Sequence, residues 1–155
     1  MKYVLICCLT AAVLSLSACS YVTDFVLINR SDNVLQVQYR VKDYPGAFAA
    51  PESPATILAS KLNPRGRQLW NKLGPDQYNL DPESRTVSMT IMPNEALLVA
   101  RMHNYGGPED VIDAKEFPLE QISLAGIKGK VDLSDRKVLT AFSEVSRALY
   151  TIEYK

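Results

Sequence analysis

The stretch that most constrains the fold of this chain is residues 35–42, LQVQYRVK. Its apolar side chains, Leu35, Val37, Tyr39 and Val41, alternate with the polar side chains of Gln36, Gln38, Arg40 and Lys42. A period of two places the first set on one face of a β-strand and the second set on the opposite face. Antiparallel sheets commonly have one face on the core and one in water, so the pattern predicts an antiparallel β-domain with the first set in its core.

Other short strands are expected at regular intervals. Residues 22–28 are an apolar run typical of a strand covered on both faces, and turn residues 29–33 join them to residues 35–42 in a predicted hairpin. Further strands are expected at 85–91, 96–102, 122–125, 130–133, 137–142 and 148–154, and residues 92–95 fit a type I turn. These elements predict a single, mainly β domain: an antiparallel β-sandwich, immunoglobulin-like or transthyretin-like.

One short helix is expected within residues 57–73. Asn63 followed by Pro64 fits an N-cap and a first helical position. The expected apolar face consists of Leu69, Trp70 and Leu73.

The same stretch contains a candidate patch for anionic groups, made of Lys61, Arg65, Arg67 and Trp70. Its ligands would be anionic lipid headgroups or a cell-wall polymer. The alternative is that Trp70 fills the core while the basic side chains stay solvated. We favour this alternative, because amphipathic helices normally bury such an apolar stripe.

Residues 43–55 contain prolines, alanines and two aromatic residues, Tyr44 and Phe48, without periodicity, and are expected to form a long loop. Tyr44 and Phe48 are the candidate partner-binding residues, because recognition often lies on loops held by rigid sheets. The alternative, which we favour, is a loop that folds over an open edge of the sandwich and tucks Phe48 beneath it.

The N-terminal residues indicate export. Lys2 is followed by an apolar run, and the residues LSA come directly before Cys19. This arrangement resembles the signal peptide and lipobox of bacterial lipoproteins. The run is shorter than the about 20 residues of a transmembrane helix. The resemblance implies that residues 1–18 are a signal peptide and that acyl chains such as palmitate on Cys19 anchor a domain of residues 19–155 in a membrane.

Ser20, the residue after the lipidated cysteine, implies the outer membrane under the enterobacterial sorting rule, with the domain facing the periplasm. The first predicted strand begins about three residues after Cys19, so the tether reaches only on the order of 10 Å. The domain is therefore expected to lie close to the bilayer.

The cysteine count and the charge exclude several classes of function. Cys7 and Cys8 lie in the predicted signal peptide and Cys19 carries lipid, so the predicted mature domain has no disulfide, no thiolate nucleophile and no cysteine metal ligand. The full chain has 17 basic and 17 acidic residues. This balance excludes general nucleic-acid binding, which needs a basic surface. No cofactor and no metal are expected.

No catalytic constellation is recognisable in the sequence. His103 is the single histidine, and at the end of a strand it more often has a structural role. No serine lies in a G-x-S-x-G turn, and Glu109, Asp110 and Asp113 lack the spacing of a calcium loop. The sequence leaves open a pair of carboxylates for glycoside hydrolysis, because the distance between two such groups is set by the fold and not by their spacing in the sequence.

Two functions remain. The first is a non-enzymatic envelope lipoprotein that binds or assembles a periplasmic or envelope protein partner. In size, anchor and β content the chain is similar to the small outer-membrane lipoprotein of type VI secretion systems, although no sequence motif carries residue roles across. The second is an envelope hydrolase or small-ligand carrier that uses the proline-rich loop as a lid. A filled core would favour the first, and a deep apolar cavity the second.

Overall fold

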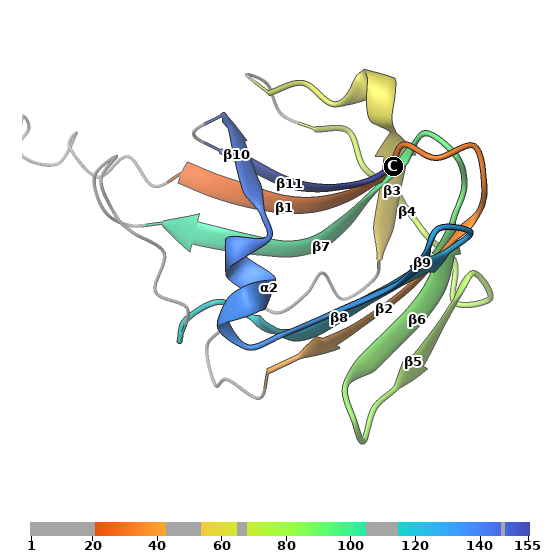
Figure 1. The fold of residues 1–155 in the computed structure, drawn as a ribbon. Helices are drawn as coiled ribbons and strands as arrows, with labels where there is room; N and C mark the ends of the chain where they lie inside the picture. The colour runs from red at the N-terminus through yellow and green to blue at the C-terminus, as the bar shows by residue number, and fades with distance from the viewer. Residues whose placement is uncertain (1–20, 43–53, 65–67, 105–114, 147) are drawn as a thin grey trace, which may run out of the picture.

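The computed structural model describes residues 21–42, 54–64, 68–104, 115–146 and 148–155. They form two β-sheets that face each other across the main hydrophobic core, which confirms the predicted mainly β sandwich (Figure 1). All but one of the strand pairs in these residues are antiparallel. This part of the chain contains no helix that is long and apolar enough to cross a membrane.

The six-stranded sheet is built around β1. In spatial order its strands are β10 (Ser143–Ser146), β11 (Leu149–Tyr154), β1 (Tyr21–Asn29), β7 (Glu95–Asn104), β3 (Ala55–Leu58) and β4 (Asn71–Lys72). β1 pairs with β7 antiparallel and with β11 parallel, and the parallel pair departs from the predicted all-antiparallel arrangement. After β9 the chain returns to this sheet through β10, and antiparallel pairing of β11 with β10 sets the direction of β11.

The five-stranded sheet has β2 at its centre. In spatial order its strands are β5 (Tyr78–Asp81), β6 (Thr86–Ile91), β2 (Leu35–Val41), β8 (Leu119–Gly126) and β9 (Gly129–Ser134). Two short helical elements complete the fold: the 3₁₀ helix η1 (Ala59–Lys61) follows β3, and α2 (Arg136–Thr140) connects β9 of this sheet to β10 of the other (Figure 1).

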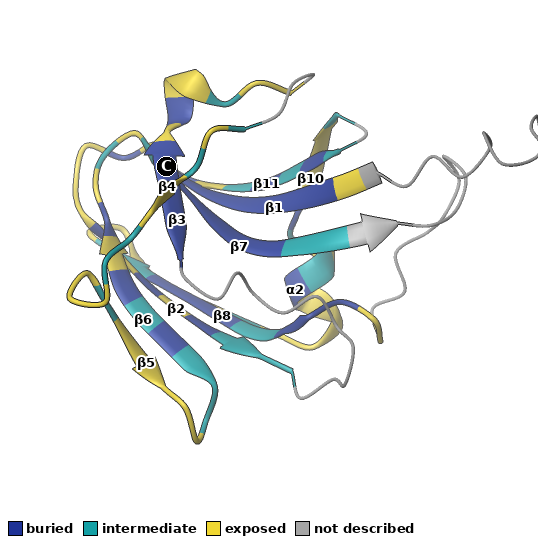
Figure 2. Cartoon of the chain, turned by 180° about the vertical axis from the view of Figure 1, so that it is seen from behind, coloured by how far each residue is buried: buried dark blue, intermediate teal, exposed yellow. Residues whose placement is uncertain are grey.

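Both faces of β1 are buried, as the apolar run predicted. Phe25 and Leu27 belong to the main core, where the ring centroids of Phe25 and Phe117 are 4.8 Å apart. Val26 and Ile28 face the opposite way and belong to a second cluster with side chains of β3 and β7. Figure 2 shows β1 buried along most of its length and β7 buried over residues 96–100, whereas β5 is largely exposed.

The register predicted for β2 is confirmed. Leu35, Val37 and Tyr39 are at most 2% exposed, while Gln36 and Gln38 face solvent. β6 lies within the strand expected at 85–91 and alternates in the same way, with buried side chains at Val87, Met89 and Ile91. Tyr150, Ile152 and Tyr154 alternate along β11, and all three pack on the main core.

The predicted hairpin between residues 22–28 and 35–42 is wrong, because β1 and β2 lie in different sheets. β1 has two apolar faces and needs a place with cover on both sides, whereas β2 has one polar face and suits a sheet with a solvated outer face. Residues 30–34 therefore arch between the sheets. The Asn29 side chain holds this arch: its Nδ2 donates to the Asn33 carbonyl at 2.8 Å and to the Ile91 carbonyl at 3.2 Å.

The helix expected within residues 57–73 is also wrong. The described part of this stretch contains β3, η1 and β4 instead, and Leu69 is 82% exposed. Trp70 packs on the second cluster and Leu73 on the main core, so the two do not share a face. The Asn63 backbone amide donates to Gln68 Oε1 at 2.9 Å, which gives this amide a side-chain partner without a helix.

Two further local predictions need correction. Residues 137–142 were predicted as a strand, but α2 occupies most of them; its Val138 is buried in the main core and Leu139 packs against that core. At the turn after β6, Glu95 donates its backbone N–H to the Met92 carbonyl at 3.1 Å, and Asn94 has a φ of 59°. A positive φ at the third position is typical of a type II turn, not of the predicted type I.

Candidate functional site

Most of the residues predicted as sites lie outside the described part of the chain. These are the lipidation residue Cys19, the loop aromatics Tyr44 and Phe48, and the basic residues Arg65 and Arg67. The side chain of His103 is likewise not described. Their roles stay predictions.

Two residues of the predicted anionic patch are described. Lys61 is exposed at the end of η1. Trp70 is half-buried against the second cluster, and its ring Nε1–H donates to Asp24 Oδ2 at 3.3 Å. The indole is therefore held by the outer face of the six-stranded sheet.

Asp24 also forms an ion pair that the sequence analysis missed. Asp24 of β1 lies directly opposite Arg101 of β7, and Arg101 binds both carboxylate oxygens, Nε to Oδ1 at 2.7 Å and Nη2 to Oδ2 at 3.0 Å. The hydrogen bonds that Arg101 donates to the Asp24 carboxylate raise the pKa of the Arg101 guanidinium. The side chain of Asp24 is only 10% exposed, so this pair ties two interior strands together under partial cover. An acidic residue within an apolar run was the signal that could have found it.

The outer face of the five-stranded sheet has a different character, because cross-strand pairing aligns uncharged polar side chains in rows. One row contains Thr90, Gln36 and Ala125 on β6, β2 and β8. The next contains Ser88, Gln38 and Ser123 on the same three strands. The two rows are one two-residue strand repeat apart.

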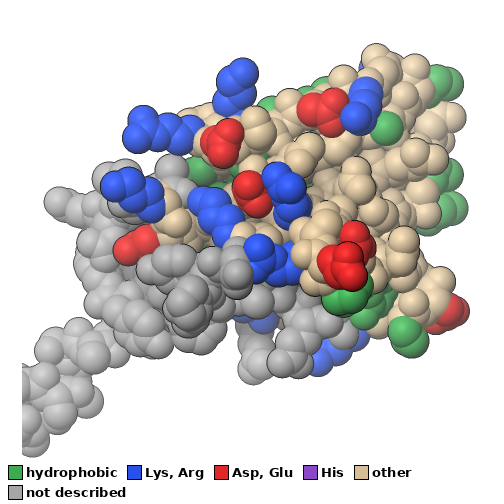
Figure 3. Space-filling view, turned by 90° about the horizontal axis from the view of Figure 1, so that it is seen from below, with side chains coloured by type: hydrophobic (Ala, Val, Ile, Leu, Met, Phe, Trp, Pro, Cys, Tyr) green, Lys and Arg blue, Asp and Glu red, His purple; other side chains and the backbone are tan. Residues whose placement is uncertain are grey.

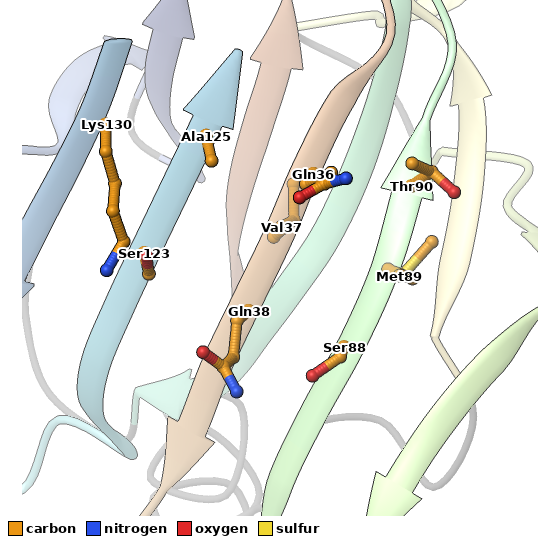
Figure 4. A pocket seen from close by; sticks show the side chains of 9 residues that line it. All are labelled: Gln36, Val37, Gln38, Ser88, Met89, Thr90, Ser123, Ala125 and Lys130. Atoms are coloured by element: carbon orange, nitrogen blue, oxygen red, sulfur yellow. The ribbon is translucent and has the colours of Figure 1, made fainter.

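A shallow hollow of about 430 Å³ lies over these rows. Figure 4 shows the amides of Gln36 and Gln38 and the hydroxyls of Ser88 and Thr90 around it, while Val37 and Met89 belong to the floor and point to the core. The side chain of Lys130 extends along the other border toward Ser123.

A second hollow, of about 490 Å³, continues from the first and shares Gln36, Thr90 and Ala125 with it. Its far end is apolar, because Val34 of the β1–β2 arch and Ile127 of the β8–β9 turn line it with 46% and 73% of their surface exposed. We call the two hollows together the β2 groove. Figure 3 looks at the molecule from this side: Lys, Arg, Asp and Glu side chains are interspersed over the surface, and hydrophobic side chains gather at the end away from the grey residues.

Two pairs of charged groups lie on the same face as the β2 groove. Lys130 Nζ lies 3.0 Å from Asp132 Oδ2, and farther along the face Arg40 Nε lies 3.1 Å from Glu120 Oε2. Hydrogen bonds from the Ser123 hydroxyl and from Lys130 lower the pKa of Asp132, so it is ionised at neutral pH. The groove therefore offers neutral donors and acceptors instead of a net charge.

Four side chains of the β2 groove keep free hydrogen-bonding capacity. Within the described residues, Gln36, Gln38, Ser88 and Thr90 make no side-chain hydrogen bond to the protein. Each amide offers two donors and an acceptor, and each hydroxyl offers both. The sequence alternation correctly placed these four in solvent but carried no sign that they would lie side by side.

No family model, curated protein or solved structure matches this chain. In the described part of the chain, no three His, Cys, Asp or Glu side chains come close enough together to hold a metal ion.

Proposed function

We propose that this chain is a lipid-anchored protein of the bacterial cell envelope that binds an envelope or periplasmic protein partner and catalyses no reaction itself. The observation that carries the proposal is the β2 groove, an accessible row of uncharged hydrogen-bonding side chains on a rigid sheet. The lipobox resemblance supplies the anchor, through acyl chains on Cys19, and the outer membrane facing the periplasm is the expected location.

The position of β1 supports a domain held close to the membrane. β1 begins at Tyr21, two residues after the predicted lipid site Cys19, and it is an interior strand that cannot separate without opening the six-stranded sheet. Its nine residues span about 26 Å at the usual rise of a strand. The apolar end of the β2 groove lies at the far end of β1, beyond Asn29, so it points away from the anchored end (Figure 1).

The interior of the sandwich supports binding over the alternative of a hydrolase or small-ligand carrier. Phe25, Phe117, Phe142 and Tyr150 pack ring against ring between the sheets, with centroids 4.8 to 5.2 Å from that of Phe25. The hollows described above lie on the outer face of the five-stranded sheet instead. A carrier needs enclosed apolar space, and an outer polar groove suits a macromolecular partner better.

Membrane fractionation tests the anchor. The full chain and its Cys19→Ser variant are expressed with an alkyne-tagged fatty acid, and membranes are washed with alkaline carbonate. We expect label and membrane retention for wild type and loss of both for the variant. Retention of Cys19→Ser in washed membranes at the wild-type level would overturn the anchor assignment.

Cross-linking in intact cells tests the partner. The lipidated wild type is compared with Ala125→Arg, which fills the β2 groove, and with the double variant Tyr44→Ala/Phe48→Ala, which removes the loop aromatics. Loss of a specific cross-linked species in either variant, with an unchanged melting temperature, supports a binding role and identifies its surface. A cross-linking pattern identical in all three proteins would argue against both surfaces.

A further inference from the structure

We infer that the β2 groove binds an extended, uncharged polypeptide segment that runs along β2 and places one apolar side chain between Val34 and Ile127. This inference rests on the proposed function, because it names the kind of partner that the same surface takes. Three properties of the groove carry it: the spacing of its polar groups, its charge and the apolar end.

The first property is the spacing. Gln36 and Gln38 are two residues apart on one face of β2, and Thr90 and Ser88 stand beside them on β6 in the same register. Side chains two residues apart on a strand are about 6.7 Å apart. An extended peptide has the same repeat, because its main-chain N–H and C=O groups point to one side at every second residue. A segment parallel or antiparallel to β2 therefore meets a donor and an acceptor at each repeat.

The second property is the charge. The lining groups with free hydrogen-bonding capacity are amides and hydroxyls, and Lys130 is paired with Asp132 at 3.0 Å. An acidic or basic ligand would find no unpaired opposite charge among these described groups. A neutral peptide main chain, which has one donor and one acceptor per residue, is complementary to this lining.

The third property is the apolar end. Val34, Ile127 and the small side chain of Ala125 all line the second hollow, which can therefore take one apolar side chain next to the polar rows. A glycan strand is the competing occupant, and sugar rings are typically bound on the faces of aromatic side chains. The described residues that line the two hollows include no aromatic side chain. This composition favours the peptide.

Selection from a random peptide library tests the inference. A phage library of linear 12-residue peptides is selected on the full chain in detergent micelles, and enriched peptides are synthesised and measured by fluorescence anisotropy. We expect enriched sequences that are uncharged and share one apolar position. A library that yields no peptide above background would overturn the inference.

Variants locate the site. Gln36→Ala/Gln38→Ala removes two side-chain amides. The double variant is expected to raise the Kd for the peptide about tenfold or more, because the losses of the individual hydrogen bonds add up to that change. Ala125→Arg blocks both hollows and should abolish binding, and Ile127→Asp should remove the preference for the apolar position. Asn79→Ala and Ser134→Ala lie on the same sheet outside the hollows and should change the Kd less than twofold. Equal Kd values for groove and control variants would refute the assignment.

A measurement without substitutions guards against altered folding. A spin-labelled copy of the best peptide should broaden the side-chain amide signals of Gln36 and Gln38 in the wild-type protein before others. Oligomers of N-acetylglucosamine are titrated in parallel. Binding of the sugars with loss in Ala125→Arg, and no binding of peptides, would make the groove a glycan site and overturn the inference. The fractionation of Cys19→Ser is independent of these results, so failure of the anchor and failure of the groove are distinguishable.

Discussion

Removing the charge of Arg101 should destabilise the domain more than removing the charge of Asp24. In the folded protein Arg101 makes two hydrogen bonds to the Asp24 carboxylate, at 2.7 and 3.0 Å, and Trp70 makes a third at 3.3 Å. The Asp24 side chain is 10% exposed, whereas that of Arg101 is 39% exposed. The two residues therefore have unequal access to water when either loses its partner.

The exposures set the magnitudes. Arg101→Met keeps most of the apolar stem of the side chain but removes the partner of the Asp24 carboxylate. That carboxylate has little contact with water, and Trp70 is its one remaining side-chain donor among the described residues. Breaking a fully buried pair costs about 3–5 kcal/mol, and the partial exposure of Arg101 lowers this to roughly 2–3 kcal/mol. Asp24→Asn leaves a guanidinium that can turn to solvent, so it should cost about 1–2 kcal/mol.

Urea unfolding of the two single variants and the double variant measures this. We expect the double variant to be less destabilised than the sum of the singles by about 1–2 kcal/mol, because each substitution removes the same interaction. Lys130→Met is the matched control: its pair with Asp132 has side chains that are 62% and 50% exposed, so its loss should change the free energy of unfolding little. Additive single effects, or a loss in Arg101→Met no larger than in Lys130→Met, would refute the reasoning.

Three other predictions concern the core and the turns. Val37→Asp places a charge in the main core and should cost more than about 3 kcal/mol, while Gln38→Asp on the other face of β2 should be near neutral; equal melting temperatures would contradict the register. Burial raises the pKa of the Tyr39 phenol well above its usual value near 10, so Tyr39 stays neutral in the folded state. The stability that depends on this neutral phenol is fully present below about pH 10 and is lost as the pH rises further, because only the unfolded state then ionises readily. The Tyr39 hydroxyl has no hydrogen-bond partner within the described residues, so Tyr39→Phe should not lower the free energy of unfolding at about pH 7. Between about pH 7 and about pH 11 the urea midpoint of Tyr39→Phe should fall less than that of wild type, and an equal fall in the two proteins would contradict this. Gly126→Ala would bring a Cβ to 2.8 Å from ring atoms of Tyr154, so circular dichroism should show thermal unfolding at a lower temperature, by an amount equivalent to about 1–3 kcal/mol, and an unchanged melting temperature would mean that the ring moves freely.

The sequence predicted most features that depend on the periodicity of apolar side chains, and few that depend on which strands pair with each other. The alternation in β2 and β6 gave the buried set correctly, because a period of two determines the face of each side chain whatever the neighbours are. The apolar run that became β1 correctly indicated two covered faces. The partners of these strands were not predictable in the same way, since the five-stranded sheet joins β2 to β6 and β8, which come much later in the chain.

The errors have local causes that can be named. Leu69, Trp70 and Leu73 fit a helical face by spacing, but Trp70 and Leu73 bury against opposite sides of the six-stranded sheet, which only a non-helical segment allows. The α-helix lies mostly within residues that were predicted as a strand, because α2 has only five residues and its single fully buried side chain, Val138, shows no periodicity. The β2 groove depends on three strands brought together by tertiary structure, so its lining was predicted only one strand at a time.

The parallel pairing of β1 with β11 makes folding depend on residues at opposite ends of the sequence. Asp24 lies beside Leu149, about 125 residues away along the chain. Contacts of such separation form late and slowly, because a long loop must close before they contribute. Until residues 149–154 are in place, β1 exposes one of its two hydrogen-bonding edges, and this edge is able to pair with other chains. A nascent or truncated form that ends before β11 is thus expected to need protection from aggregation, and the last strand acts as the closing piece that ends this vulnerable period.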